Sequence, residues 1–150
     1  MKSYATIAEL QHEVGRETVV GDWIEVTQER IQRFADATGD HQWIHVDPMR
    51  AKAGPFGTTI AHGFLTLSLL PEMSARAIEV RDTRMGVNYG LNKVRFPAPV
   101  PSGSRLRGQF PLVKFEPLEG GAQLTYEVRM EREGSDKPVC IAESVGRRYA

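Results

Sequence analysis

Apolar residues recur at helical spacing in the first part of the chain, and clear end signals separate the segments. Between residues 3 and 15 the apolar positions lie three and four apart, which predicts a short helix that ends at Gly15. The run TVVGDWIEV then predicts a strand with a turn or bulge at Gly21–Asp22. The next helical pattern follows Thr27, a suitable N-cap, and stops at Gly39, which suits the left-handed position after a helix.

The segment that follows Gly39 changes from polar to apolar near its middle. We expect residues 40–46 to form a loop, and Asp47–Pro48 to begin a short helix as its N-cap and first helical residue. Residues 60–70, IAHGFLTLSLL, are almost all apolar. A helix that is apolar on nearly every side is expected to be buried.

This apolar stretch predicts the central helix of the fold. Thr58 or Thr59 can cap its N-terminus, and the pattern continues to about Ile78. Pro71 lies near the middle and is expected to kink the helix, because proline has no N–H to donate.

From Met85 onward the apolar period changes from helical spacing to two, which is typical of strands. A change of phase predicts a bulge near Lys93, and Gly120–Gly121 predicts a hairpin. Residues 122–131 alternate strictly and predict a strand with one wet face. Helices followed by an antiparallel meander indicate an α+β fold. A long apolar helix wrapped by a curved antiparallel sheet is the hotdog architecture.

Composition limits the classes of function. The chain has 150 residues, which predicts one domain over 1–150, and its 19 basic and 19 acidic residues give zero net charge. We therefore expect neither a nucleic-acid nor a membrane partner. Cys140 is the one cysteine, so no internal disulfide can form. It lies in a strand-like run and is expected to be a buried strand residue. The first residues lack the apolar core of a secretion signal, which predicts a cytoplasmic location.

Two titratable residues stand just before the central helix. Asp40 and His45 lie five positions apart, and a carboxylate and an imidazole that converge on one water can act as general base and general acid. The same residues are also typical of a turn and of a partly buried structural site. Both interpretations stay open on spacing alone.

Three further features bear on the chemistry. His41, His45, His62 and Asp40 could together suggest a metal site, but no H-E-x-x-H motif or cysteine pair accompanies them, and we expect no metal. Gly63 either packs closely against a strand or offers its N–H to a substrate carbonyl. Ser68 either bonds its own helix backbone or supports the Asp40 side chain.

The segment GDHQWIHVDPMRAKAGPFGTTIAHGFLTLSLL resembles the MaoC-like dehydratases, the (R)-specific enoyl-CoA hydratases of hotdog fold, and especially their nodulation-protein-N-type branch. The later RFPAPVPSG is similar to a strand and turn of the same family. The resemblance implies that Asp40 and His45 are catalytic, that the Gly63 amide holds the thioester oxygen, and that Ser68 supports the substrate site. Gln42–Trp43 depart from the Asn-Pro that is common in the family loop.

The resemblance also implies a reaction and a set of partners. The expected reaction is the reversible (R)-specific hydration of trans-2-enoyl-CoA in fatty acid metabolism, with an acyl-CoA as substrate, no cofactor, and a homodimer as the assembly. Two alternatives remain: a hotdog acyl-CoA thioesterase, and a non-catalytic acyl-binding module.

Overall fold

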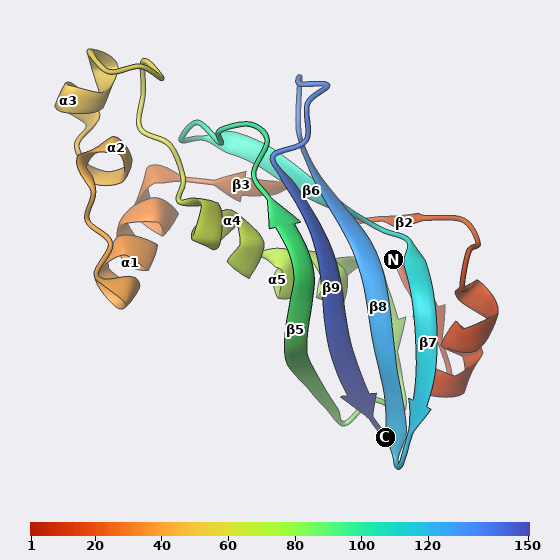
Figure 1. The fold of residues 1–150 in the computed structure, drawn as a ribbon. Helices are drawn as coiled ribbons and strands as arrows, with labels where there is room; N and C mark the ends of the chain where they lie inside the picture. Colours follow the sequence, from red (N-terminus) through yellow and green to blue (C-terminus); the bar gives the residue numbers. More distant parts are fainter.

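A curved antiparallel sheet is the main feature of the computed structural model, which describes residues 1–150. Its strands follow the order β2-β6-β8-β9-β5, with β3 beside β6 and β7 beside β8 (Figure 1). The strands of this sheet are β2 (Val19–Val20), β3 (Ile24–Val26), β5 (Met85–Arg95), β6 (Ser104–Phe110), β7 (Leu112–Leu118), β8 (Gly121–Arg132) and β9 (Cys140–Tyr149).

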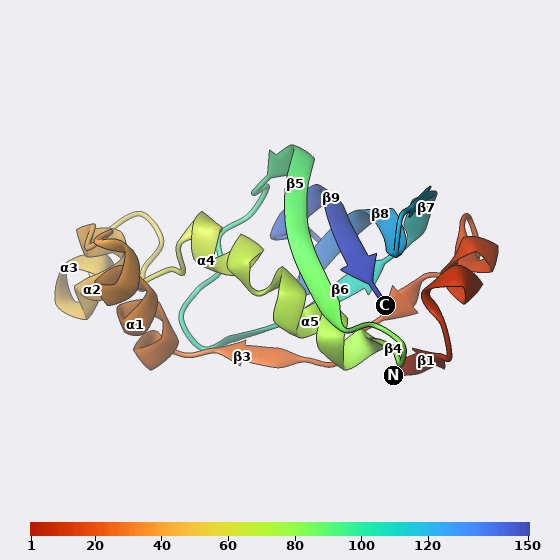
Figure 2. The same cartoon turned by 90° about the horizontal axis from the view of Figure 1, so that it is seen from below.

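The helices α4 (Gly63–Ser68) and α5 (Leu70–Ala77) cross the concave side of this sheet (Figure 2). Leu65, Leu69 and Met73 on the helical segment belong to one buried cluster that also includes β-strand residues. Burial of a leucine-sized side chain contributes about 1.5–3 kcal/mol to the stability of the fold. The strand residues of this core include Leu106, Phe110, Leu124, Val128 and Met130.

The central helix starts later than the sequence predicted, but the interruption expected near Pro71 is present. Its N-cap is His62 rather than the predicted Thr58 or Thr59, because the two residues before His62 are held by a distant segment. Ile60 forms a bridge with Pro101, and the Ala61 N–H donates to the carbonyl of Val100 at 2.8 Å. The helix is then interrupted at Leu69, between α4 and α5, and Pro71 lies in the first turn of α5, where proline is tolerated; the predicted break near Pro71 is therefore confirmed.

Burial of this segment is also less complete than predicted. Phe64 is 71% exposed, so one side of α4 is not covered in the single chain.

The helices between β3 and α4 gather at one end of the molecule (Figure 1). There α1 (Gln28–Thr38) packs against α2 (Trp43–Val46), and α2 packs against α3 (Pro48–Lys52). The Thr27 Oγ1 accepts a hydrogen bond from the Arg30 N–H, and Gly39 has φ of 80°, so both predicted ends of α1 are confirmed. Asp47 caps α3 as predicted. The loop predicted over 40–46 contains the short helix α2, which the polar, turn-rich composition concealed.

The N-terminal helix predicted over residues 3–15 is only partly correct. The chain begins with β1 (Lys2–Tyr4), which pairs in parallel with β4 (Ile78–Val80), and then forms the 3-10 helix η1 (Ile7–Glu13). Contact between these distant strands overrides the local helical spacing.

From Met85 onward the structure contains the predicted strands, but consecutive strands are not all neighbours in the sheet, so the order is not that of a meander. The irregularity near Lys93 and the hairpin at Gly120–Gly121 are both present. However, β5 pairs with the last strand, β9, and is therefore an edge of the sheet. Cys140 is buried in β9, and this burial raises the pKa of its thiol to about 11. No helix in the structure is long and apolar enough to cross a membrane.

Candidate active site

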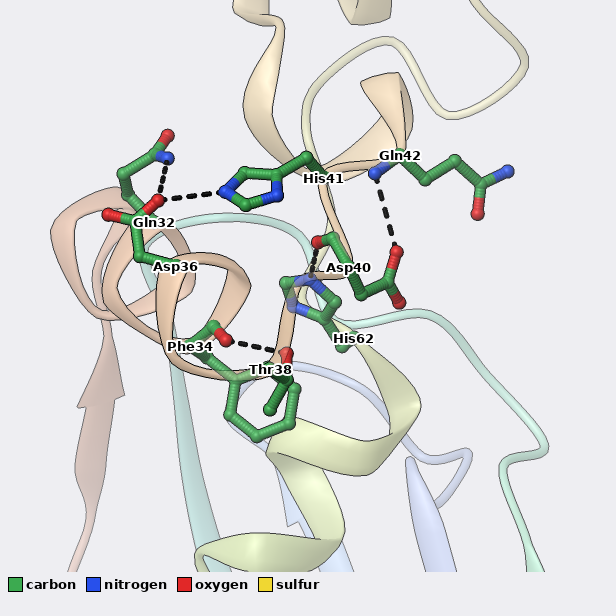
Figure 3. Close-up of polar contacts among 8 residues, drawn as sticks. All are labelled: Gln32, Phe34, Asp36, Thr38, Asp40, His41, Gln42 and His62. Carbon is green, nitrogen blue, oxygen red and sulfur yellow. Dashed lines mark hydrogen bonds and ion pairs between the residues drawn. The ribbon is translucent and has the colours of Figure 1, made fainter.

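Asp40 lies in the turn that leaves α1. Gly39 adopts the left-handed conformation and directs the chain away from the helix axis. The Asp40 side chain is exposed, and its Oδ1 accepts a hydrogen bond of 3.3 Å from the Gln42 N–H (Figure 3). The carboxylate is thus held by a local turn and remains open to solvent and to a ligand.

His45 is presented from the short helix α2 and is only 6% exposed. Its Nδ1 lies 2.7 Å from the carbonyl oxygen of Ile60. Because a carbonyl can only accept, Nδ1 carries the proton and the neutral ring offers a lone pair at Nε2. The structure therefore fixes the tautomer that a general base requires.

The backbone of His45 is held by a second contact. Gln28, at the start of α1, donates through Nε2 to the His45 carbonyl at 2.8 Å. The Oε1 of the same Gln28 accepts a hydrogen bond of 2.6 Å from the Thr59 hydroxyl. One amide side chain thus connects α1, α2 and the segment before α4.

The pKa of His45 is lowered from its ordinary value of 6.5. Burial is the main cause, because it disfavours the charged imidazolium, and repulsion from His62 lowers the pKa further. The Ile60 carbonyl and the Asp40 carboxylate oppose this shift. The net result is a neutral, proton-accepting ring at neutral pH.

His62 completes the cluster from the residue before α4. A carboxylate oxygen of Asp40 and a ring nitrogen of each of His45 and His62 lie within 4.8 Å of one another. These are also the side chains that could hold a metal ion. The bonds of both imidazoles to carbonyl oxygens orient them as in many zinc sites. The expectation of no metal remains a prediction.

Gly63 is the first residue of α4, where a backbone N–H has no acceptor within its own helix. The Gly63 N–H also donates to no backbone carbonyl among the turn, loop and cap hydrogen bonds. A Cβ at this position would lie 3.0 Å from the ring of Phe96. A hollow of about 290 Å³ opens beside Gly63, and Phe56, Ile60 and Phe96 are among its mainly apolar lining residues.

Ser68 is not brought to the cluster. Its Oγ donates to the Phe64 carbonyl one turn earlier at 2.6 Å, and the residue is exposed. It lines a different hollow, which lies between the central helices and the strands β5 and β9. The geometry corresponds to the helix-backbone alternative rather than to support of Asp40.

Comparison with known proteins decides the family. A model of the "MaoC like domain" matches residues 9–133 of the chain. The chain belongs to the MaoC-like family. The family and the fold predicted from the loop motif and the hydrophobic pattern are both confirmed, and so is the assignment to the dehydratase class of enzymes.

The similarity of this MaoC-like protein to curated relatives extends over nearly the whole chain. It is 54% identical to the 3-hydroxyacyl-thioester dehydratase Z of Mycobacterium tuberculosis, over 100% of both chains. It is 48% identical to Nodulation protein N of Rhizobium leguminosarum bv. viciae, over 91% of this chain and 87% of the relative.

A solved structure shares the fold. The R-hydratase PhaJ1 of Pseudomonas aeruginosa superposes with a TM-score of 0.74 at 23% sequence identity, over 94% of this chain and 83% of that one.

Two residues of the MaoC-like site were missed by sequence reasoning as partners of the acid–base pair. Gln28 stands in a helical pattern and has no local signal, because its partners lie 17 and 31 residues away. His62 was noted only as a possible metal ligand, yet it contacts both members of the pair. Its position in Ala-His-Gly, directly before an apolar helix, was the available signal.

Proposed function

We propose that this MaoC-like protein catalyses the reversible (R)-specific hydration of trans-2-enoyl-CoA thioesters to (R)-3-hydroxyacyl-CoA. The observation that carries the proposal is the approach of the Asp40 carboxylate to His45, whose Nε2 lone pair is free. The relative from Mycobacterium tuberculosis, named as a 3-hydroxyacyl-thioester dehydratase, supports the substrate class. The (R) configuration rests on the likeness of GDHQWIHVDP to the hydratase motif.

The proposed mechanism uses the residues already described. The thioester oxygen accepts a hydrogen bond from the Gly63 N–H, which stabilises the developing enolate. One water lies between Asp40 and His45, and His45 Nε2 accepts its proton as the oxygen bonds to C3. A proton passes from the pair to C2, so the acid–base groups end in their starting state and one water has been added. This chemistry uses no cofactor.

The apolar hollow beside Gly63 supports a substrate with an acyl group. Its volume of about 290 Å³ adjoins the proposed oxyanion donor, and Phe56 and Phe96 contribute to its lining. Apolar surface of this kind favours the burial of a hydrocarbon chain. A thioester bound at Gly63 would lie directly beside it.

We also propose that the protein is a homodimer. Strand β5 is a sheet edge whose backbone has no second neighbour, and its apolar side chains at Met85, Val87, Tyr89 and Leu91 are exposed. Unpaired edges with apolar surface are normally covered by another strand or chain. A second copy of β5 would satisfy the same edge.

The deciding experiment is the hydration of crotonyl-CoA, followed as loss of enoyl-thioester absorbance. Asp40→Asn and His45→Gln should each lower kcat about 100- to 10,000-fold, because each removes a positioned acid–base group. The double variant should lose much less than the product of the two effects, since both groups serve one step. His41→Gln is the matched control, because His41 is exposed and pairs with Asp36 instead.

The products also separate the alternatives. Release of free CoA would indicate a thioesterase, and binding without turnover would indicate an acyl-binding module. Near-wild-type rates in both single variants, or effects that simply multiply, would contradict a water shared by Asp40 and His45.

A further inference from the structure

His62 occupies an unusual position for a residue at a helix start. It is the N-cap of α4, yet its side chain makes no capping bond and is only 2% exposed. The ring instead points toward the turn that carries Asp40 (Figure 3). Its Nδ1 is buried and has no hydrogen-bond partner in the chain. Buried polar atoms normally have such a partner, so the presence of a histidine here needs another explanation.

The first contact of His62 is with the backbone of Asp40. The His62 Nε2–H donates to the Asp40 carbonyl oxygen at 3.0 Å, across 22 residues of sequence (Figure 3). The turn that bears Asp40 lies between α1 and α2 and belongs to no helix or strand. This bond therefore ties the backbone beneath the carboxylate to the start of the central helix.

The second contact is with the ring of His45. The two imidazoles are stacked, with centroids 3.8 Å apart and planes inclined by 24°. Phe34 from α1 packs against the His62 ring as well, with centroids 4.8 Å apart. Because His45 is also tied to the Ile60 carbonyl, its ring is restrained both in its plane and against its face.

We propose that His62 is a positioning residue that holds Asp40 and His45 at their working separation, through one hydrogen bond and one ring stack. The proposal rests on the proposed function, in which Asp40 and His45 share a water. A residue that served only as core filling would need neither contact.

Two variants separate the two contacts. His62→Phe keeps an aromatic ring for the stack but removes the donor to Asp40, whereas His62→Gln keeps an N–H at a similar distance but removes the ring. A displacement of about 1 Å in a catalytic group can cost on the order of 100-fold in rate. We expect each variant to lower kcat for crotonyl-CoA by about that factor, with KM nearly unchanged. His41→Gln, in the same turn, should behave as wild type.

The split between kcat and KM is the readout that simple loss of packing would not produce. A shift of Asp40 or His45 out of position slows the chemical step, whereas a general loosening of the site would also weaken substrate binding and raise KM.

The outcomes distinguish this inference from the proposed function. In an active wild type, an unchanged kcat in either folded variant overturns the positioning role. If the wild type hydrates no enoyl thioester, the proposed function fails instead. Melting temperatures confirm that the variants compared are folded.

Discussion

At the scale of single residues, the protonation of His45 sets the expected pH dependence. Its pKa is lowered from 6.5 by burial and by His62, so the neutral base persists below that pH. Activity should therefore be full at neutral pH and fall as pH decreases, with the acid limb of kcat/KM below 6.5. The unfolded chain takes up the proton first, so the same shift makes folding less favourable as pH falls through this range.

The measurement is kcat/KM for crotonyl-CoA between acid and neutral pH. The neighbouring His41 titrates in the opposite sense, since its hydrogen bond to Asp36 raises its pKa. His41→Gln should leave the acid limb in place. Two results would contradict the assignment to His45: a fall in kcat/KM whose midpoint is at or above pH 6.5 in the wild type, or a midpoint that shifts in His41→Gln.

Gly63 allows a substitution that removes its N–H without breaking the helix. Proline is tolerated at the first position of a helix, and His62 already has the extended conformation, with ψ of 141°, that a residue before proline prefers. Gly63→Ala is the matched control, because it places the same Cβ against Phe96 but keeps the N–H. Gly63→Pro should be about 100- to 1,000-fold slower in kcat than Gly63→Ala, as expected for loss of one oxyanion donor.

Equal rates in these two variants would remove the Gly63 amide from the mechanism. Phe96 is 38% exposed, so its ring has room to move aside in both.

The sequence allowed Asp40 and His45 to be predicted as a pair because both lie in one short segment. The contacts of His62 and Phe96 could not be predicted in the same way, because they join residues that are 22 positions apart or lie on different elements. Only the folded backbone brings such groups together.

At the scale of elements, Gln28 connects α1 to the segment that carries the site. Gln28→Ala removes the donor to the His45 carbonyl and the acceptor of the Thr59 hydroxyl. Unpaired buried polar groups typically cost about 1–3 kcal/mol. For a chain of this size that corresponds to a melting temperature lower by roughly 2–12 °C. Gln32→Ala is the control, since Gln32 lies on the exposed side of the same helix.

Calorimetry of the two variants tests this role. A melting temperature for Gln28→Ala equal to that of Gln32→Ala would show that the connection is not stabilising.

Helix ends were predicted where local chemistry determines them. The hydroxyl of Thr27, the carboxylate of Asp47 and the left-handed Gly39 each act within one turn, and each lies where predicted. The start of α4 was not predictable in this way, because Ile60 and Ala61 are held extended by Pro101 and Val100 on a distant segment.

At the scale of the whole molecule, the fold class was predictable but the order of strands was not. A change from helical spacing to alternation indicates α+β from the sequence alone. The pairing of β5 with β9 joins segments about 50 residues apart, for instance Asn92 with Glu143, and no local pattern reports it. That pairing is what leaves β5 at the edge of the sheet.

The exposed edge leads to a prediction about assembly. Light scattering at micromolar concentration should give twice the mass of one chain, because β5 presents unpaired backbone groups and apolar side chains. Leu91→Lys should shift the protein toward monomers, since an edge lysine opposes strand addition. Val113→Lys is the matched control: Val113 is also an exposed apolar strand residue, 38% exposed against 45% for Leu91, but lies on β7. A monomeric wild type, or dissociation by Val113→Lys alone, would show that β5 is not the contact.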